Sequence, residues 1–380
     1  MKKILFASTA LAALAVGGAA SAEIALFGSA RLGIGYNIDN EGNVDLEAVT
    51  SQNAQGITVV DRWEGTEDLR AVSRIRFGVT MTGESDSGIT FGATIRADNA
   101  NQGGTSATAA TGQLAGEVFV SGAWGTLTYG DTNGADEQNV GDAIGNVALT
   151  GLGDFNETPY FSNGGGFGDD AIQFANNPEA RPTVRYDYNF MGVQVSASTN
   201  RTLNDVGVGA SYTYEFDEGS VTGGVGYYDF QEFTTTFAGI PGLVEVKGGE
   251  QWSVGATGTF GGFSAGVVYT AASMDSNNDL VSGDLDVIIG GLGYTWDAWT
   301  LNAYYANVMT GNGSFEYFDG NDSYGASVQY DLGGGASVNF GVAQTYGRAQ
   351  IGDRNDVIDS YYAAEIEDAT VADFGIKMAF

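Results

Sequence analysis

Apolar and polar residues alternate with a period of two along most of this chain, and this pattern constrains the fold more than any other feature. Between residues 24 and 36 every even position is apolar or glycine, whereas Ser29 and Arg31 occupy odd positions. Successive side chains of a β-strand point to opposite faces, so each such segment predicts a strand with one apolar and one more polar face. Sixteen segments of this kind start near residues 24, 70, 88, 114, 125, 183, 193, 206, 220, 251, 263, 285, 299, 323, 336 and 370.

The breaks between these segments alternate in length. Short breaks contain turn-forming residues, as in Gly122-Ala123 and Asp297-Ala298. Long breaks fall at 37–69, 99–113, 132–182, 230–250, 273–284, 309–322 and 347–369, and the short break at 201–205 is the exception to the alternation. Antiparallel strands with short turns at one end and long loops at the other are typical of an outer-membrane β-barrel.

A barrel accounts for the two-faced strands better than a soluble β-sandwich or β-helix does. In hydrocarbon every backbone N–H and C=O group needs a partner, and a sheet provides all of them only by closing on itself. A soluble fold would instead need a second layer over the apolar faces, and the sequence has no helical segments to supply it. Aromatic residues near strand ends, such as Tyr294, Trp296 and Trp299, predict girdles at the membrane–water boundary. We therefore predict an all-β, 16-stranded antiparallel transmembrane β-barrel.

Residues 1–22 have the features of a secretory signal peptide. Two lysines precede a stretch rich in alanine and leucine, and Ala20-Ser21-Ala22 forms a small-residue cleavage site. We expect residues 23–380 to form one transmembrane barrel domain. Cleavage leaves 13 basic residues against 47 acidic ones, a net charge of −34. A chain with this charge is not expected to bind nucleic acid through its phosphates.

The composition excludes several kinds of active site. The chain has no cysteine and no histidine, which removes thiol chemistry, disulfides, and the commonest general base and metal ligand. We therefore expect no enzymatic activity and no required cofactor. Acid-rich loops do offer oxygen ligands, so Ca²⁺ loosely bound by these loops is a further expectation, without assigned ligands.

Several segments of the chain resemble Gram-negative general-diffusion porins, in the branch found in alphaproteobacteria such as the purple photosynthetic bacteria. These segments are SRIRFGVTMTGESDSGITFGATIRAD (73–98), EVFVSGAWGTLTYGD (117–131), YDLGGGASV (330–338) and the closing VADFGIKMAF. The resemblance implies a homotrimer in the outer membrane of a Gram-negative bacterium, in contact with outer-membrane lipid and lipopolysaccharide. It also implies a long third loop folded into each lumen, passive diffusion of small hydrophilic solutes and ions, and recognition of the terminal Phe380 by the membrane-insertion machinery.

Charged residues are unevenly distributed, as a polarised channel would require. Five basic residues lie on the first three predicted strands in the polar phase: Arg31, Arg70, Arg74, Arg76 and Arg96. With a tight turn at 83–87, Arg74 would lie opposite Arg96, and the arginines would form a stripe on the lumen wall. No basic residue occurs between positions 97 and 180, a stretch with 11 acidic residues. The acids favoured for a constriction loop within 132–182 are Asp136, Glu137, Asp142 and Asp154.

An acidic loop facing an arginine wall would impose a transverse field on a narrow, water-filled waist. Unit charges about 8 Å apart at an effective dielectric constant near 20 interact by roughly 2 kcal/mol, and salt reduces this energy. The alternatives are arginines neutralised by neighbouring acids and a loop that is solvated outside the barrel. The net charge favours a mild preference for cations, which the local arginines would oppose.

Two other functions are compatible with a two-faced β protein. A solute-selective outer-membrane channel, for instance for sugars, would carry an aromatic ladder along its lumen, whereas Phe27, Phe119 and Tyr304 are scattered. A surface or adhesin-like β protein would show internal repeats, and the sequence has none. The sequence therefore favours an outer-membrane porin for passive diffusion.

Overall fold

The wall of the molecule is built almost entirely from β-strands. The computed structural model describes residues 23–38, 46–52, 58–65, 69–101, 115–143, 158–163, 182–235, 244–278, 282–313, 320–345 and 369–380. The first half of the wall comprises β1 (Glu23–Asn37), β4 (Leu69–Glu84), β5 (Thr90–Asn101), β6 (Ala115–Gly122), β7 (Gly125–Gly130), β8 (Pro182–Phe190), β9 (Val193–Asn200) and β10 (Val206–Phe216). The second half comprises β11 (Gly219–Phe230), β13 (Val244–Phe260), β14 (Phe263–Ser276), β15 (Gly283–Trp296), β16 (Trp299–Gly311), β17 (Asp322–Gly333), β18 (Ala336–Thr345) and β19 (Ala369–Ala379).

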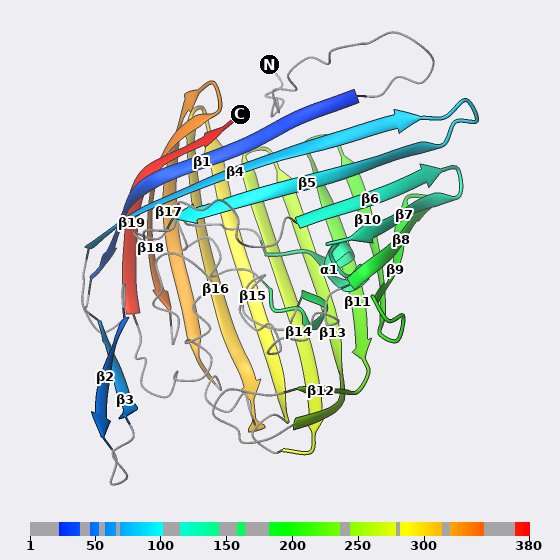
Figure 1. The fold of residues 1–380 in the computed structure, drawn as a ribbon. Coiled ribbons are helices and arrows are strands. Elements are labelled where there is room, and N and C mark those ends of the chain that lie inside the picture. The colour runs from blue at the N-terminus through cyan, green and yellow to red at the C-terminus, as the bar shows by residue number, and fades with distance from the viewer. Residues whose placement is uncertain are drawn as a thin grey trace.

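These strands close into a barrel, which Figure 1 shows from the side. Each pairs antiparallel with the wall strands before and after it, and β1 pairs with β4 on one edge and with β19 on the other. The short β12 (Phe233–Thr235) continues the line of β11 by pairing with the start of β13. The predicted 16-stranded antiparallel barrel is therefore confirmed.

The strand starts agree with the predicted ones within two residues, with one exception. β13 begins at Val244 instead of at 251, because its first residues still pair with β12 and β14. The short connection at 201–205 is also present. The predicted signal peptide lies outside the described residues.

Besides the short β12, the sequence did not predict a hairpin, a helix and a 3₁₀ turn. The hairpin of β2 (Leu46–Gln52) and β3 (Thr58–Gly65) forms a separate two-stranded sheet within the first long connection. The helix α1 (Ala135–Val140) and the 3₁₀ turn η2 (Phe161–Asn163) lie in the long connection between β7 and β8. None of the helices in the described ranges has the length and apolar character needed to cross a membrane.

The outer face of the wall is apolar and exposed, as the alternation predicts. On β1 and β4, Ile24, Leu32 and Ile75 keep 56%, 51% and 58% of their surface accessible. The intervening residues Ser29 and Arg31 pair across the sheet with Arg76 and Arg74, on the opposite face. A wall with this exposed apolar surface is expected to lie in hydrocarbon.

Aromatic side chains gather at the end of the barrel where the short turns lie. Phe216 stacks near Phe260, and Phe263 contacts Tyr294 across β14 and β15. Ring contacts then continue from Tyr294 to Trp296, Trp299 and Tyr330. This row occupies the place where the sequence predicts an aromatic girdle.

The inner face is less polar than the sequence suggests. A buried cluster of aliphatic side chains on β13, β14 and β15 includes Val246, Val268 and Ile289, with at most 1% of their surface exposed. Val140 and Phe161, from the connection between β7 and β8, belong to the same cluster. The inner face is therefore apolar in part, because segments of the chain inside the barrel cover this stretch of the wall.

Candidate channel constriction

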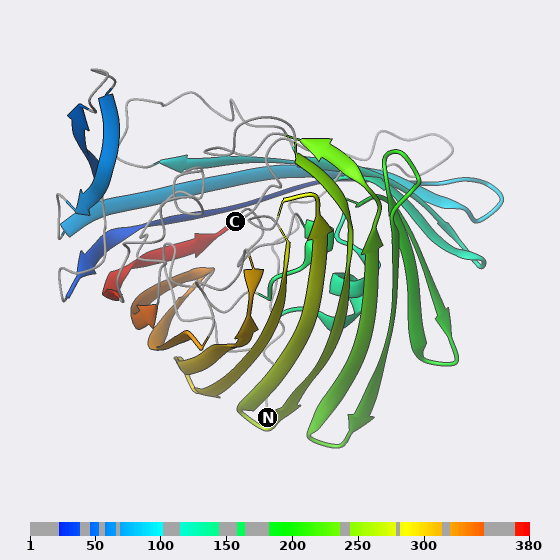
Figure 2. The same ribbon diagram turned by 90° about the horizontal axis from the view of Figure 1, so that it is seen from below.

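The helix α1 packs against the inner face of β9, β10, β11 and β13 (Figures 1 and 2). Its six residues are too few to be stable in isolation, so its stability depends on contacts with the wall. Residues 131–143 and 158–163 are the described parts of the connection between β7 and β8. The expectation of a long third loop folded into the lumen stays a prediction, because most of this connection lies outside the described residues.

Glycines on the wall form a seat for this helix. A Cβ atom on Gly224 would lie 2.0 Å from the carbonyl oxygen of Asn139, and one on Gly209 would lie 2.2 Å from that of Ala135. A Cβ atom on Gly226 would lie 2.6 Å from Cα of Asp136. Such distances are far shorter than a van der Waals contact, so the backbone of α1 approaches the wall as closely as it does only because these positions lack side chains.

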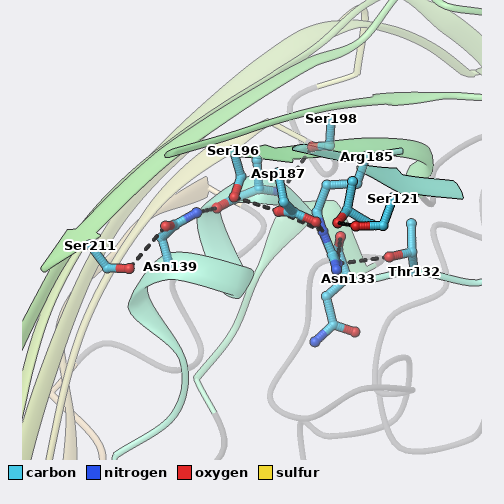
Figure 3. Close-up of polar contacts among 11 residues, drawn as sticks. Ser121, Thr132, Asn133, Asn139, Arg185, Asp187, Ser196, Ser198 and Ser211 are labelled. Atoms are coloured by element: carbon cyan, nitrogen blue, oxygen red, sulfur yellow. Dashed lines mark hydrogen bonds and ion pairs between the residues drawn. The ribbon is translucent and has the colours of Figure 1, made fainter. Parts of the chain in front are cut away.

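Hydrogen bonds fix α1 to β9 and β10 (Figure 3). The Ala135 N–H group at the start of α1 donates to the Ser198 hydroxyl over 2.9 Å. The Asn139 side chain donates to the Ala135 carbonyl over 2.7 Å and accepts a hydrogen bond from Ser211 over 3.0 Å. The wall hydroxyl thus satisfies one of the N–H groups that a helix start leaves unpaired.

The second described piece of the loop, residues 158–163, is bound to β13 and to the end of α1. The Phe161 N–H group donates to Gln251 Oε1 over 2.6 Å, and Gln251 Nε2 donates to the Pro159 carbonyl over the same distance. The Tyr160 hydroxyl donates to the Gly141 carbonyl over 2.7 Å. Burial, followed by the charges of Asp136 and Asp142, raises the pKa of Tyr160. The phenol therefore stays protonated and remains a donor.

Arg185 on β8 clamps the start of the loop to the wall. Its Nε lies 2.9 Å from Asp187 Oδ2, and Nη1 donates to the Thr132 hydroxyl over 2.7 Å and to the Asn133 carbonyl over 2.9 Å (Figure 3). Ser196 donates to Asp187 Oδ1 over 2.6 Å. Sequence reasoning missed this pair, although both residues occupy the polar phase of β8, between Val184, Tyr186 and Tyr188.

The predicted loop acids have different surroundings. Asp136 is fully buried and accepts a hydrogen bond from Ser162 over 3.1 Å, which joins the two loop pieces. Glu137 is 9% exposed, whereas Asp142 is exposed and accepts from the Thr158 N–H group over 2.8 Å. Asp154 lies outside the described residues. A buried carboxyl does not contact a passing solute, so Asp136 has a structural role in this arrangement, and Asp142 is the acid of this set with exposed surface.

Replacing Asp136 with asparagine should stabilise the docked loop at neutral pH. Burial raises the pKa of Asp136 from 3.8 to about 6, although the Ser162 hydroxyl opposes this shift. A carboxyl with a raised pKa favours the docked loop when protonated, so in the wild type this stabilisation is present in acid and is lost as the pH rises through about 6. Asparagine is neutral at every pH, so the substitution removes the cost of burying a charged carboxylate. For a pKa shift from 3.8 to about 6, this cost is roughly 3 kcal/mol at most.

The measurement is hydrogen exchange of the α1 amides between pH 4 and pH 8, corrected for intrinsic exchange rates. The protection of the D136N variant should exceed that of the wild type at pH 8, and the difference should disappear near pH 4. The exposed turn residue Asp86, changed to asparagine, is the matched control and should leave α1 unaffected. Equal protection of D136N and wild type at pH 8 would contradict the argument.

The predicted arginines lie on the other side of the barrel from α1, on the inner phase of β1, β4 and β5. Arg31 pairs directly with Arg74 on β4 and with Lys377 on β19. Arg76 is paired in the sheet with Ser29 on β1 and with Asp98 on β5. Arg70 pairs with Gly35 through the backbone. We call Lys377, Arg31 and Arg74 the basic row; Lys377 was missed, although it falls in the polar phase of the last strand.

The prediction that Arg74 lies opposite Arg96 is wrong. Arg74 pairs with Ala100, and Arg96 pairs with Gly78. The pair that closes this hairpin is Glu84 and Thr90, so the turn lies two residues later than predicted and the cross-strand partner of Arg74 moves by four residues. The arginines therefore share a face but are spread along the strands. Their role at a constriction, like that of the loop acids, stays a prediction.

Aromatic residues of the inner phase lie flat against glycines of the neighbouring strands. The ring of Phe27 covers Gly78, and the ring of Phe119 covers Gly92, since added Cβ atoms there would lie 2.1 Å and 2.6 Å from ring atoms. Tyr304 similarly covers Gly325 and is only 4% exposed. These rings fill gaps in the sheet surface.

Among the residues that the structure describes, no group of three or more aspartate or glutamate side chains is arranged to bind a metal ion. The expected Ca²⁺ therefore has no assigned ligands in these segments.

A closed barrel with an exposed apolar outer face, charged inner side chains and chain segments docked inside it defines a membrane channel. The sequence profile of the Gram-negative porins matches residues 7–350, and the chain belongs to this family. The family that the sequence resembles is thereby confirmed. As a porin, the chain forms a water-filled channel for the passive diffusion of small hydrophilic solutes.

Individual relatives agree with this assignment. The porin of Rhodobacter capsulatus is 28% identical over 381 residues, which cover 94% of this chain and 100% of the relative. A porin structure refined at 1.8 Å has a TM-score of 0.57 at 23% identity, with 94% of this chain and 100% of that chain covered. A mutant of the Rh. blastica porin has a TM-score of 0.54 at 18% identity and the same coverage. The two structures share the fold of this chain.

Proposed function

We propose that the protein is a homotrimeric diffusion channel in the outer membrane of a Gram-negative bacterium, formed by a mature chain that starts at Glu23. Its narrowest part lies between the loop segments docked on β9 to β13 and the basic row. The observation that carries this proposal is the position of these two features on opposite sides of one closed barrel. Solutes pass between them, and the charges on each side select among ions.

The two sides of the waist are proposed to present their charges to a solute to different extents. Arg31 and Arg74 are partly exposed on the inner face, whereas Asp136 is buried in the opposite wall. The basic row therefore counteracts the net charge of −34 of the mature chain at the point where an ion is closest to the wall. We expect weak selectivity as a result, with its sign set by the local charges more than by the total.

A sugar-selective channel is the alternative from the sequence, and the aromatic side chains do not favour it. Such a channel needs successive rings that offer their faces to a sliding sugar. Phe27, Phe119 and Tyr304 instead lie on glycines of β4, β5 and β17.

Conductance in a planar lipid bilayer tests the proposed function. Purified mature protein should insert as stepwise, ohmic increments, grouped in threes for a trimer, and a salt gradient should give a small reversal potential. Correctly folded protein that never conducts would exclude an open diffusion channel.

The proposed partners can be tested separately. Lipopolysaccharide and outer-membrane lipid should co-purify with the trimer, whose mass can be measured in detergent. If the acid-rich loops bind Ca²⁺, a chelator should lower the thermal stability of the trimer, and added Ca²⁺ should restore it.

A further inference from the structure

A hollow of about 810 Å³ opens on the outer face of the wall across β13, β14, β15 and β16. Its floor consists of small outward-facing residues: Ala256, Gly258, Ala265, Gly290 and Ala303. These are neighbours in the sheet, since Gly258 pairs with Ala265 and Gly290 lies between Val267 and Tyr305. A hollow of this size lies within the usual range for small-molecule sites, about 300–1,000 Å³.

Large apolar side chains form the rim of the hollow. Leu292, Phe263 and Phe260 line it and keep 62%, 61% and 57% of their surface exposed. No charged side chain is among the residues that line it. The hollow therefore suits a flexible hydrocarbon chain.

The chain's own packing does not require a glycine at Gly290. Its backbone lies outside the left-handed region, and an added Cβ would meet nothing closer than the Gly266 carbonyl oxygen at 3.8 Å. Glycine weakens a strand, and it often marks a place where a ligand approaches closely. The absent side chain at Gly290 thus leaves space for a molecule outside the barrel.

The end of the hollow lies beside acidic turns. Phe216, Phe260 and Phe263 line it next to the turns at 217–218 and 261–262, and the Gly261 N–H group donates to the Glu218 carbonyl over 3.0 Å. Asp217, Glu218 and Asp297 are exposed at this end. The stretch from 205 to 345 contains a single basic residue, Lys247, which lies at the far end of β13. A head group here would meet negative charge.

We propose that the hollow binds one acyl chain of an aminophospholipid from the leaflet on the side of the short turns. The inference rests on the proposed position of the barrel in a membrane. The acyl chain lies over Gly290 and Ala265, and the ammonium group of the lipid contacts the carboxylate of Glu218, while Asp297 adds negative charge at the same end of the barrel. A charged donor and a carboxylate form a strong hydrogen bond, whereas an anionic head group would be repelled.

Native mass spectrometry of the protein with phosphatidylethanolamine or phosphatidylglycerol of identical acyl chains tests this. As the detergent concentration is raised, the wild type should retain one phosphatidylethanolamine molecule per chain. It should retain far less phosphatidylglycerol under the same conditions. Gly290→Leu should retain about tenfold less, because its side chain excludes at least two methylene groups from the hollow. Ala93→Leu is the matched control, since it adds similar bulk to the outer face of β5, and should behave as wild type.

A second pair of substitutions tests the head group. Glu218→Gln combined with Asp297→Asn should remove the preference for phosphatidylethanolamine; asparagine tolerates the positive φ of 46° at position 297. Equal retention by Gly290→Leu and wild type, or equal retention of the two lipids, would overturn the proposal. The proposal would also be overturned if Gly290→Leu dissociated the subunits and left lipid binding unchanged. In that case the hollow would be occupied by a second copy of the chain. Conductance of the same samples tests the proposed function independently.

Discussion

Replacing Gly224 with valine is expected to release α1 from the inner wall of the barrel. A Cβ at this position would lie 2.0 Å from the Asn139 carbonyl oxygen and 3.1 Å from Cα of Val140. Backbone atoms of the helix cannot rotate away as a side chain would, so the whole helix must move. Overpacking of this kind costs about 1–3 kcal/mol, and the upper value corresponds to roughly a hundredfold faster amide exchange in α1.

The neighbouring Gly223 provides the matched control. It belongs to the same strand but faces outward, and an added Cβ there would meet nothing within 4 Å. Gly223→Val should therefore leave α1 protected, although it introduces the same side chain one residue away. Hydrogen exchange of the Ala135 to Val140 amides measures the effect, and single-channel recordings should show increased current noise in the Gly224→Val channel alone. Equal protection in the two variants would show that the glycine seat does not hold the helix.

The barrel could be predicted from sequence because each strand carries its own signal. The alternation in β1, β5 or β19 reflects a wall with two different surroundings, and it needs no information from distant residues. The start of β13 was missed although Val244 and Val246 alternate with Glu245 and Lys247. Strand pairing continues beyond the apolar belt, so the end of the outward-facing apolar residues is a poor marker of the end of the strand.

Register depends on turn geometry, which the sequence fixes less strongly. The hairpin of β4 and β5 closes at Glu84 and Thr90, with Ser85 accepting from the Gly88 N–H group within the turn. A tight turn at 83–87 would displace the partner of Arg74 from Ala100 to Arg96. The faces stay the same because the displacement is an even number of residues, so the arginines keep a common strand phase although their cross-strand neighbours differ from the predicted ones.

The parts of the site that the sequence did not reveal depend on contacts between distant segments. The six residues of α1 are too short for a helical period to be recognised, and the glycines that accept the helix lie about 75–90 residues later in the chain. The buried environment of Asp136 also arises only when α1 meets β11. Lys377 and Arg185, in contrast, occupy the polar phase of their strands, and a search for every charge in that phase would have found them.

Reversing the charge of the basic row should shift ion selectivity strongly towards cations. Arg31 and Arg74 are direct partners on the inner face, so changing both to glutamate replaces two positive charges by two negative ones at one level of the lumen. Unit charges about 8 Å from a passing ion act on it by roughly 2 kcal/mol each at an effective dielectric constant near 20, and salt screening reduces this. Even if salt screening leaves only about 1.4 kcal/mol of this energy, the ratio of cation to anion permeability should rise about tenfold.

The reversal potential in a salt gradient measures this ratio, and it should fall back towards the wild-type value as ionic strength rises. Arg201, exposed in the connection between β9 and β10, is the matched control, because its change to glutamate alters the total charge as much as Arg31→Glu does. If the total charge governed selectivity, Arg31→Glu and Arg201→Glu would shift the reversal potential equally. A larger shift for Arg31→Glu would place the selective step beside the basic row, whereas equal shifts would exclude it from the narrowest part of the channel.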